Sequence, residues 1–321
     1  MASDSIAAAA QGRFAPIEAK PVLDPLAVSV MVALCVCWGL NQVAIKVAEA
    51  GIPPVLQAGL RSAGAGVLLL CWMRARRIPL LDRDGSLWPG LAVGALFGVE
   101  FLLFYVGLDL TTVSRGVVFL YSAPFWVAIG AHLFLPDDRL SPMKLAGLAA
   151  AFAGLLLAFA DGLHTTAAHG TLLGDGLCLM SAMLWGATTL VVKGTRLVAI
   201  RAEKTLFYQL GVSAVMLLPA SLLMGERGIA HADWLVLGAL AYQIVLVAFA
   251  SYVAWFWLMM RYPASLLSSF SFLAPVLGVG FGALLLGDHV GPTLGAAVAL
   301  IAGGIYVVNR PARRVRKPAR C

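Results

Sequence analysis

Hydrophobic residues fall into ten long runs along the chain, and short segments rich in glycine, proline and polar residues separate them. Most runs approach the roughly 20 residues that an α-helix needs to cross the hydrocarbon core of a bilayer. Barrel strands would instead give segments of about 10 residues with alternating polarity, so the pattern favours helices. The sequence therefore predicts an all-α integral membrane protein with ten transmembrane helices, at about residues 26–48, 54–73, 87–108, 112–134, 143–160, 171–193, 204–224, 234–258, 264–286 and 293–309.

The composition excludes an ordinary soluble domain. The chain is 61% hydrophobic and 12% charged, with a mean hydropathy of +0.90, whereas a soluble domain is about half apolar and about a quarter charged. A net charge of +7 would suggest nucleic acid as a partner of a soluble protein. In a membrane protein, basic cytoplasmic loops explain it better. We therefore expect the lipid bilayer, and no nucleic acid, as a partner.

The distribution of basic residues predicts the orientation. If the amino terminus lies inside, 19 of the 23 Lys and Arg residues fall in inner segments. The outer half then keeps only four, namely Lys46, Arg61, Arg115 and Arg227. Because cytoplasmic loops carry the excess of basic residues, we expect both termini in the cytoplasm. Residues 1–25 are expected to form a cytoplasmic tail without a signal peptide, and residues 310–321 a basic cytoplasmic tail.

The chain repeats itself. A shift of 147 positions pairs WGLNQVAIK at residues 38–46 with WGATTLVVK at residues 185–193, and a shift of 151 pairs FLYSAPF at 119–125 with FSFLAPV at 270–276. Residues 26–160 and 171–309 are thus expected to be two copies of one five-helix unit. Five is an odd number, so the second copy enters the membrane from the opposite face. This is the inverted repeat on which alternating-access transporters are commonly built.

Ionisable residues inside the predicted spans are the first candidates for a substrate site, because burying a charge in a membrane is unfavourable. Glu100 and Arg61 lie deep in their spans, and Lys46 and Arg115 lie nearer the outer surface. In one interpretation Glu100 and Arg61 form a structural ion pair, and the other two side chains extend to the interface. In the other, the basic residues receive a substrate carboxylate while Glu100 binds an amino group or carries a proton. The shift of 151 relates Glu100 to Ser251, and a shift of 148 relates Arg61 to Gln209, so the charges occur in one half only.

Aromatic and small polar residues could complete the site. Trp38 and Trp185 open the paired motifs, and Asn41 and Thr188 follow one helical turn later; helix packing is the alternative role. Further candidates for a pocket that suits flat or bulky solutes are Tyr121, Trp255 and Phe272.

Two prolines are candidate hinges. Pro124 and Pro275 lie in the middle of their spans, where each would remove a backbone hydrogen bond and kink its helix. The freed carbonyls of Leu120 and Ser271 could then face a cavity. A static kink is the alternative.

Several enzyme signatures do not occur in the sequence. It contains no GxxxxGK[ST] phosphate loop, no HExxH and no GxSxG, and its five histidines and five cysteines show no spacing typical of a metal site. We therefore expect no cofactor, no metal and no catalytic residue. An intramembrane enzyme based on Glu100 is a distant alternative.

These motifs together resemble the EamA type of the drug/metabolite transporter superfamily. The resemblance rests on the paired WG motifs, on Arg61, on APF and APV in the fourth and ninth spans, and on LFLPDD and LLLGD, which stand where that family usually has LGE. It implies a ten-helix exporter of small metabolites in the bacterial inner membrane, with a central cavity between the repeats. The chain is similar to exporters of amino acids, including aromatic ones. Export of drugs or of nucleotide-sugar-like metabolites is the alternative, and the sequence specifies neither proton coupling nor an oligomeric state.

Overall fold

The computed structural model describes residues 22–80, 82, 84–111, 113–136, 138–160, 171–286 and 293–310, and all regular structure in these ranges is helical. The helices are α2 (Pro25–Glu49), α3 (Pro54–Ala75), α4 (Leu87–Leu110), α5 (Val113–Leu120), α6 (Ala123–Phe134), α7 (Pro142–Ala158), α9 (Thr171–Gly194), η1 (Arg196–Ala199), α10 (Ala202–Leu223), α11 (Trp234–Tyr242), η2 (Gln243–Ser251), α12 (Tyr252–Met259), α13 (Ala264–Phe270), α14 (Leu273–Leu286) and α15 (Leu294–Val308). Most of both predicted tails, and Asp137 and Asp288 of the acidic motifs, lie outside the described residues.

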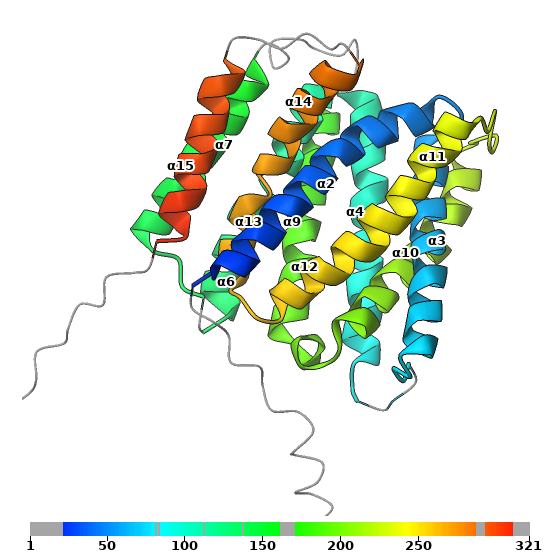
Figure 1. Cartoon of the computed structure of the whole chain (residues 1–321), viewed down its shortest axis with the longest axis horizontal. Helices are drawn as coiled ribbons and strands as arrows, with labels where there is room; N and C mark the ends of the chain where they lie inside the picture. Colours follow the sequence, from blue (N-terminus) through cyan, green and yellow to red (C-terminus); the bar gives the residue numbers. More distant parts are fainter. Residues whose placement is uncertain are drawn as a thin grey trace, which may run out of the picture.

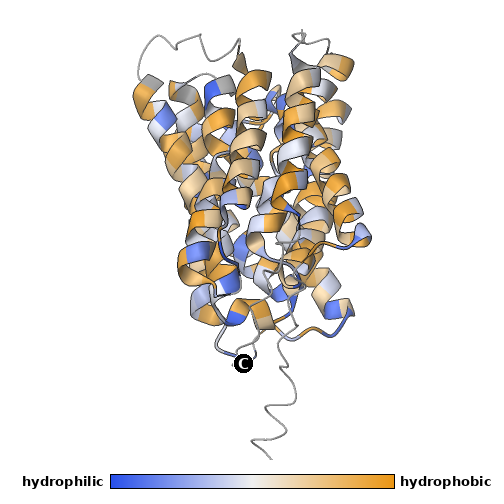
Figure 2. Ribbon diagram, turned by 90° about the vertical axis from the view of Figure 1, so that its left-hand side faces the viewer, coloured by the Kyte–Doolittle hydropathy of each residue, from blue (hydrophilic) through white to orange (hydrophobic). Residues whose placement is uncertain are grey.

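The predicted membrane fold is confirmed. Eight helical segments are long and apolar enough to span a bilayer, and two shorter apolar helices occupy the predicted fifth and tenth spans. Large apolar side chains such as Leu172 and Leu223 are exposed on the outside of the bundle. Figure 2 shows hydrophobic residues along most of the helix length and hydrophilic residues gathered toward the ends and between the helices. Lipid is therefore the solvent of the outer surface.

The two proline-containing spans are broken, and this corrects the expected kink. Each consists of two helices joined by a turn: α5 and α6 in one case, α13 and α14 in the other. Pro124 is the second residue of α6 and Pro275 the third of α14, positions where the missing N–H leaves no helical hydrogen bond unmade. The Ser271 carbonyl accepts from the Ala274 N–H at 3.1 Å, so it is not the free acceptor that the kink would leave.

The packing follows a twofold pattern. Helix α2 packs on α14 as α9 packs on α6, and α3 on α10 and α7 on α15 are self-equivalent pairs (Figure 1). A Cβ added to Gly39 would lie 2.8 Å from the Leu277 Cβ, and one added to Gly186 would lie 2.9 Å from the Trp126 Cβ. These contacts relate by the same shifts of 147 and 151 as the motifs. Glycine is required at both positions because the helices approach so closely.

The equivalent helices run in opposite directions. The Tyr262 hydroxyl donates to Asp24 Oδ2 at 2.8 Å, just before α2 begins. The Lys193 ammonium, where α9 ends, donates to the carbonyl of the same Tyr262 at 2.7 Å. The start of α2 and the end of α9 therefore lie at one end of the bundle, which we call the closed end for reasons given below.

An ion pair between α10 and the segment before α4 also lies at the closed end of the bundle. Lys204 Nζ lies 2.7 Å from Asp84 Oδ2, and both side chains are largely buried. Burial raises the pKa of Asp84, but hydrogen bonds from Lys204 and Ser86 outweigh this effect and the pKa falls below its ordinary value. A carboxyl whose pKa is lower in the folded state stabilises the fold above its unfolded pKa, and this contribution is lost as the pH falls through the folded pKa.

We therefore expect Asp84→Asn to destabilise the protein at pH 7 by about 1 to 2 kcal/mol, because it leaves Lys204 buried without its counter-ion near the solvated end of the bundle. The difference from wild type should shrink as the pH is lowered from 7 through the folded-state pKa of Asp84, because the carboxyl is then protonated in both states. Thermal unfolding in detergent across this pH range measures it. The matched control is Asp82→Asn, which keeps the backbone carbonyl that Lys204 also contacts. Equal stability of the two variants at pH 7 would contradict the prediction.

Candidate functional site

A cavity of about 520 Å³ lies between the two halves of the bundle. It extends from Met259, the last residue of α12, past Trp38 and Trp185 to Lys46, Glu49 and Leu108, where α2 and α4 end. On α2 its wall includes Gln42, Lys46 and Glu49, which are all solvent-exposed. The cavity therefore opens at the end of the bundle opposite the Lys193 contact, and we call this the open end.

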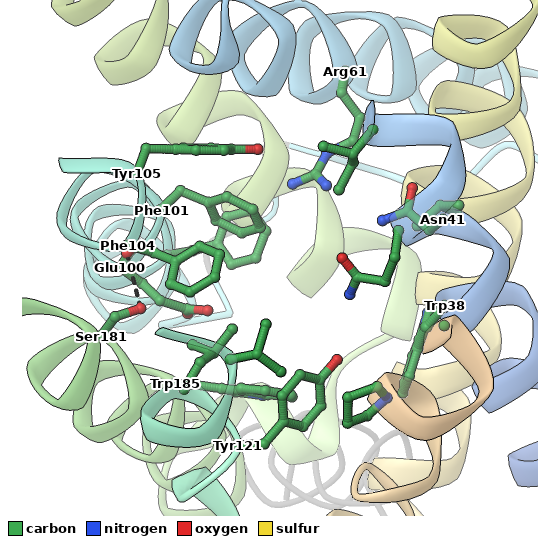
Figure 3. A pocket seen from close by; sticks show the side chains of 18 of the residues that line it. Trp38, Asn41, Arg61, Glu100, Phe101, Phe104, Tyr105, Tyr121, Ser181 and Trp185 are labelled. Carbon is green, nitrogen blue, oxygen red and sulfur yellow. Dashed lines mark hydrogen bonds between the residues drawn. The ribbon is translucent and has the colours of Figure 1, made fainter. Parts of the chain in front are cut away.

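Most residues predicted for the site line this cavity. They are Trp38, Asn41, Lys46, Arg61, Glu100, Tyr121, Trp185, Thr188 and Trp255, together with the predicted hinge residue Pro275. Figure 3 shows how ten of the lining side chains are arranged around the cavity.

Three predicted residues do not line the cavity. Phe272 is fully buried and packs against Phe125 and Phe152. Pro124 is buried in the first turn of α6. Ser251 lies behind the wall, where its hydroxyl accepts from Trp38 Nε1 at 2.9 Å.

Arg61 and Glu100 are buried without forming a salt bridge with each other. Their exposed fractions are 2% and 7%. Among the described residues, Arg61 Nε and Nη2 and Glu100 Oε2 have no hydrogen-bond partner. The Arg61 guanidinium instead lies over the Phe101 ring, 4.5 Å from its centroid, and Figure 3 shows Phe101 between the two charged groups. The structure thus contradicts a structural ion pair and leaves two charged groups available to a ligand.

Backbone and aromatic contacts hold this arrangement in place. The Ser181 hydroxyl on α9 donates to the Glu100 backbone carbonyl at 3.0 Å. The rings of Trp38 and Trp255 meet edge to face with centroids 5.5 Å apart, and those of Tyr121 and Trp185 do so at 5.8 Å. Such edge-to-face pairs are favourable and fix ring orientation. Ser251 ends the π-helical segment η2, a type of backbone that is frequent at functional sites.

Sequence reasoning missed several residues of the cavity wall. Gln42 follows Asn41 directly, and Phe101 follows Glu100, but neither motif indicates which neighbour faces inward. Gln209 lies on α10 at the position that corresponds to Arg61 on α3. Its Oε1 atom, like Asn41 Oδ1, is buried without a partner among the described residues. The repeat in the sequence relates Gln209 to Arg61 by a shift of 148 positions, but it does not show that the Gln209 side chain lines the cavity.

The cavity contains no evident metal site. Among the described residues, no three His, Cys, Asp or Glu side chains lie close enough together to hold a metal ion.

Because Arg61 and Glu100 lack each other as partners, removing one charge should not destabilise the fold as breaking a buried ion pair does, which costs about 3 to 5 kcal/mol. We expect Glu100→Gln to unfold within about 1 kcal/mol of wild type or to be more stable, since the amide is cheaper to bury than a carboxylate. Thermal unfolding in detergent at pH 7 tests this, with Asp84→Asn as the matched loss of a paired acid. A decrease of several kcal/mol in the free energy of unfolding would instead support the interpretation that Glu100 and Arg61 form a structural ion pair.

Comparison with known proteins relates this chain to membrane transporters. The model of the EamA-like transporter family matches residues 25–160 and 172–310. The chain is 29% identical over 293 residues to the "Probable amino-acid metabolite efflux pump" of Salmonella typhimurium, covering 89% of this chain and 95% of that protein. It is also 29% identical over 232 residues to the "Riboflavin transporter" of Rhizobium johnstonii, covering 70% of each.

A solved crystal structure shares the fold. Its TM-score is 0.77 at 24% sequence identity, and the match covers 90% of this chain and 98% of that one. The twofold packing, the cavity between the halves and the double match of the family model agree with one another. The chain is a multi-pass membrane protein that belongs to the EamA-like transporter family.

Proposed function

We propose that this protein exports amino acids, including aromatic ones, across the bacterial inner membrane by alternating access, with both termini in the cytoplasm. The observation that carries the proposal is the pair of buried charged groups, Arg61 and Glu100, on opposite sides of Phe101 in an aromatic cavity, with Arg61 Nε and Nη2 and Glu100 Oε2 lacking hydrogen-bond partners among the described residues. Two relatives named as amino-acid metabolite efflux pumps support the substrate class.

The charges suit a zwitterion. Guanidinium and carboxylate atoms that are buried without hydrogen-bond partners, as these are among the described residues, are unfavourable, and a substrate carboxylate and ammonium would supply such partners. Arg61 is the group for the carboxylate because its N–H donors are fixed in a planar fork, and Gln209 and Asn41 add neutral polar atoms nearby. Glu100 would then receive the ammonium. A solute with only one charge would leave one buried group unpaired.

The rest of the cavity suits an aromatic side chain. Trp38, Trp185, Tyr121 and Phe101 present ring faces and edges to the cavity, and rings pair favourably in offset or edge-to-face geometry. The volume of about 520 Å³ falls within the range of about 300 to 1,000 Å³ typical of small-molecule sites. Larger flat solutes are the second candidate, because one relative is named a riboflavin transporter.

The test is solute flux in proteoliposomes that contain the purified protein. We expect phenylalanine, tyrosine and tryptophan to cross faster than in empty liposomes. Phenylacetate and phenethylamine, which each lack one of the two charges, should cross no faster than in empty liposomes. Flux of riboflavin, drugs or nucleotide sugars alone would contradict the amino acid assignment.

Arg61 can be tested by substitution. We expect Arg61→Met to raise KM for aromatic amino acids by about 10- to 100-fold, since charge-assisted hydrogen bonds contribute about 1.5 to 3 kcal/mol. Arg61→Lys should recover part of this loss, because it keeps the charge without the planar fork. Unchanged KM in Arg61→Met would show that the guanidinium does not bind the substrate.

Coupling to protons is tested at Glu100. If Glu100 carries a proton, export should respond to an imposed pH gradient, and Glu100→Gln should abolish that response. Wild-type flux that is indifferent to the gradient would show facilitated diffusion.

A further inference from the structure

Lys193 holds the closed end of the bundle together. Its ammonium donates to the backbone carbonyls of Met259, where α12 ends, and of Tyr262, in the turn before α13. The same end is fixed by Asp138, whose carboxylate accepts from the Ser265 N–H at the start of α13 at 2.9 Å. Every residue of α13 is buried. The connection between α12 and α13 therefore cannot move away while Lys193 holds these carbonyls.

The repeat defines the counterpart of this contact at the open end. The shift of 147 relates Lys193 to Lys46, and the shift of 151 relates Met259 to Leu108 and Tyr262 to Thr111. The second relation has independent support in the structure. The Thr111 hydroxyl donates to Asp175 Oδ1 at 2.7 Å, just as the Tyr262 hydroxyl donates to Asp24 Oδ2 at 2.8 Å. Each hydroxyl thus ties a connection to the start of the first helix of the other half.

The two ends differ at the positions of the lysines and of the short helices. At the open end, Lys46 and Val117 of α5 line the cavity, whereas Leu108 and its counterpart Met259 both line it and so do not distinguish the ends. At the closed end, the counterpart of Val117 is Ser268 of α13, which is only 6% exposed. The hydroxyl–aspartate bonds form at both ends, so they do not distinguish the states. The lysine–carbonyl bonds of Lys193 form at the closed end.

We propose that Lys193 and Lys46 are alternating locks. Lys193 closes one end by binding the Met259 and Tyr262 carbonyls in the state seen here. In the opposite state Lys193 releases these carbonyls, and Lys46 binds those of Leu108 and Thr111. The proposal rests on alternating access as part of the proposed function. It assigns Lys46 to the gate rather than to substrate binding.

The physical basis is the exchange of one set of charge-assisted hydrogen bonds for an equivalent one. Helix ends present carbonyls without helical partners, and a lysine near such an end is favoured by both hydrogen bonding and the helix dipole. Removing one lock should therefore bias the two-state equilibrium toward the state that the other lock stabilises. Hydrogen bonds to charged groups are strong enough to shift it by about tenfold.

The experiment measures maleimide labelling rates of purified full-length protein in detergent, with a cysteine introduced at position 117 or 268. The background labelling of the five native cysteines is subtracted. In Lys193→Met we expect the ratio of the rate at 268 to the rate at 117 to rise about tenfold. In Lys46→Met the ratio should fall, and in the double variant it should return toward that of wild type. Lys193→Arg, which keeps the donors, should change it least.

The matched control is Lys204→Met, which removes a buried lysine at the same end without a counterpart in this scheme. It should lower thermal stability and leave the labelling ratio unchanged. A Lys193→Met ratio equal to that of Lys204→Met would overturn the proposal, as would a shift of Lys46→Met in the same direction as Lys193→Met. If Lys193→Met does not fold, the Lys46→Met variant provides the test by itself, because Lys46 is exposed. An unchanged labelling ratio in Lys46→Met would then overturn the proposal.

Labelling needs no substrate, so it separates this proposal from the proposed function. Wild-type proteoliposomes that move no amino acid would defeat the substrate assignment while the opposite shifts in labelling still support the locks. Amino acid flux without these labelling shifts would support the proposed export function and contradict the lysine locks.

Discussion

The unfavourable free energy of placing polar groups in a medium without water governs this molecule. Every backbone N–H and carbonyl within the bilayer needs a partner, which is why the described spans are helical. For the same reason, the turns at the two breaks in the proline-containing spans are closed by backbone hydrogen bonds between residues three positions apart. The same cost makes the cavity informative. Arg61 and Glu100 lie deep in the bundle with polar atoms that have no hydrogen-bond partner among the described residues, and a purely structural interior would have been more stable with apolar side chains there.

The two halves use one architecture for different tasks. At equivalent positions the second half has Ser251 and Gln209 where the first has Glu100 and Arg61. Ser251 accepts from Trp38 Nε1 and so fixes one tryptophan of the cavity wall. Trp185, the counterpart of Trp38, lies at the wall near Glu100 (Figure 3). A nearly symmetric scaffold therefore holds an asymmetric set of polar groups, as the recognition of an asymmetric solute requires.

The sequence predicted the spans and the duplication well because both rest on patterns that many residues share. Runs of apolar residues identify the helices, and Gly39 with Gly186 recur at the fixed spacing that close helix packing demands. It could not predict which way each side chain points. Apart from Glu100 and Asp109, α4 is apolar on all faces, so amphipathicity does not reveal that Phe101 faces the cavity. Likewise, the repeat relates Phe272 to Tyr121, which lines the cavity, but the Phe272 ring packs against Phe125 and Phe152 in the core instead. The form of the helix breaks depended on local backbone hydrogen bonding, which a lone proline does not specify.

Inverted duplication also explains how the proposed locks can be matched at the two ends of the bundle with few side chains. The acceptors of Lys193 are backbone carbonyls, and their positions are set by where α12 ends rather than by the side chains of Met259 and Tyr262. The corresponding residues at the other end, Leu108 and Thr111, differ in chemistry but present the same backbone atoms near the end of α4. One lysine retained in each copy is then sufficient to place a donor at each end of the bundle. In the proposed lock scheme, the duplicated and inverted five-helix unit thus supplies a lysine and a pair of backbone carbonyls at each end of the bundle.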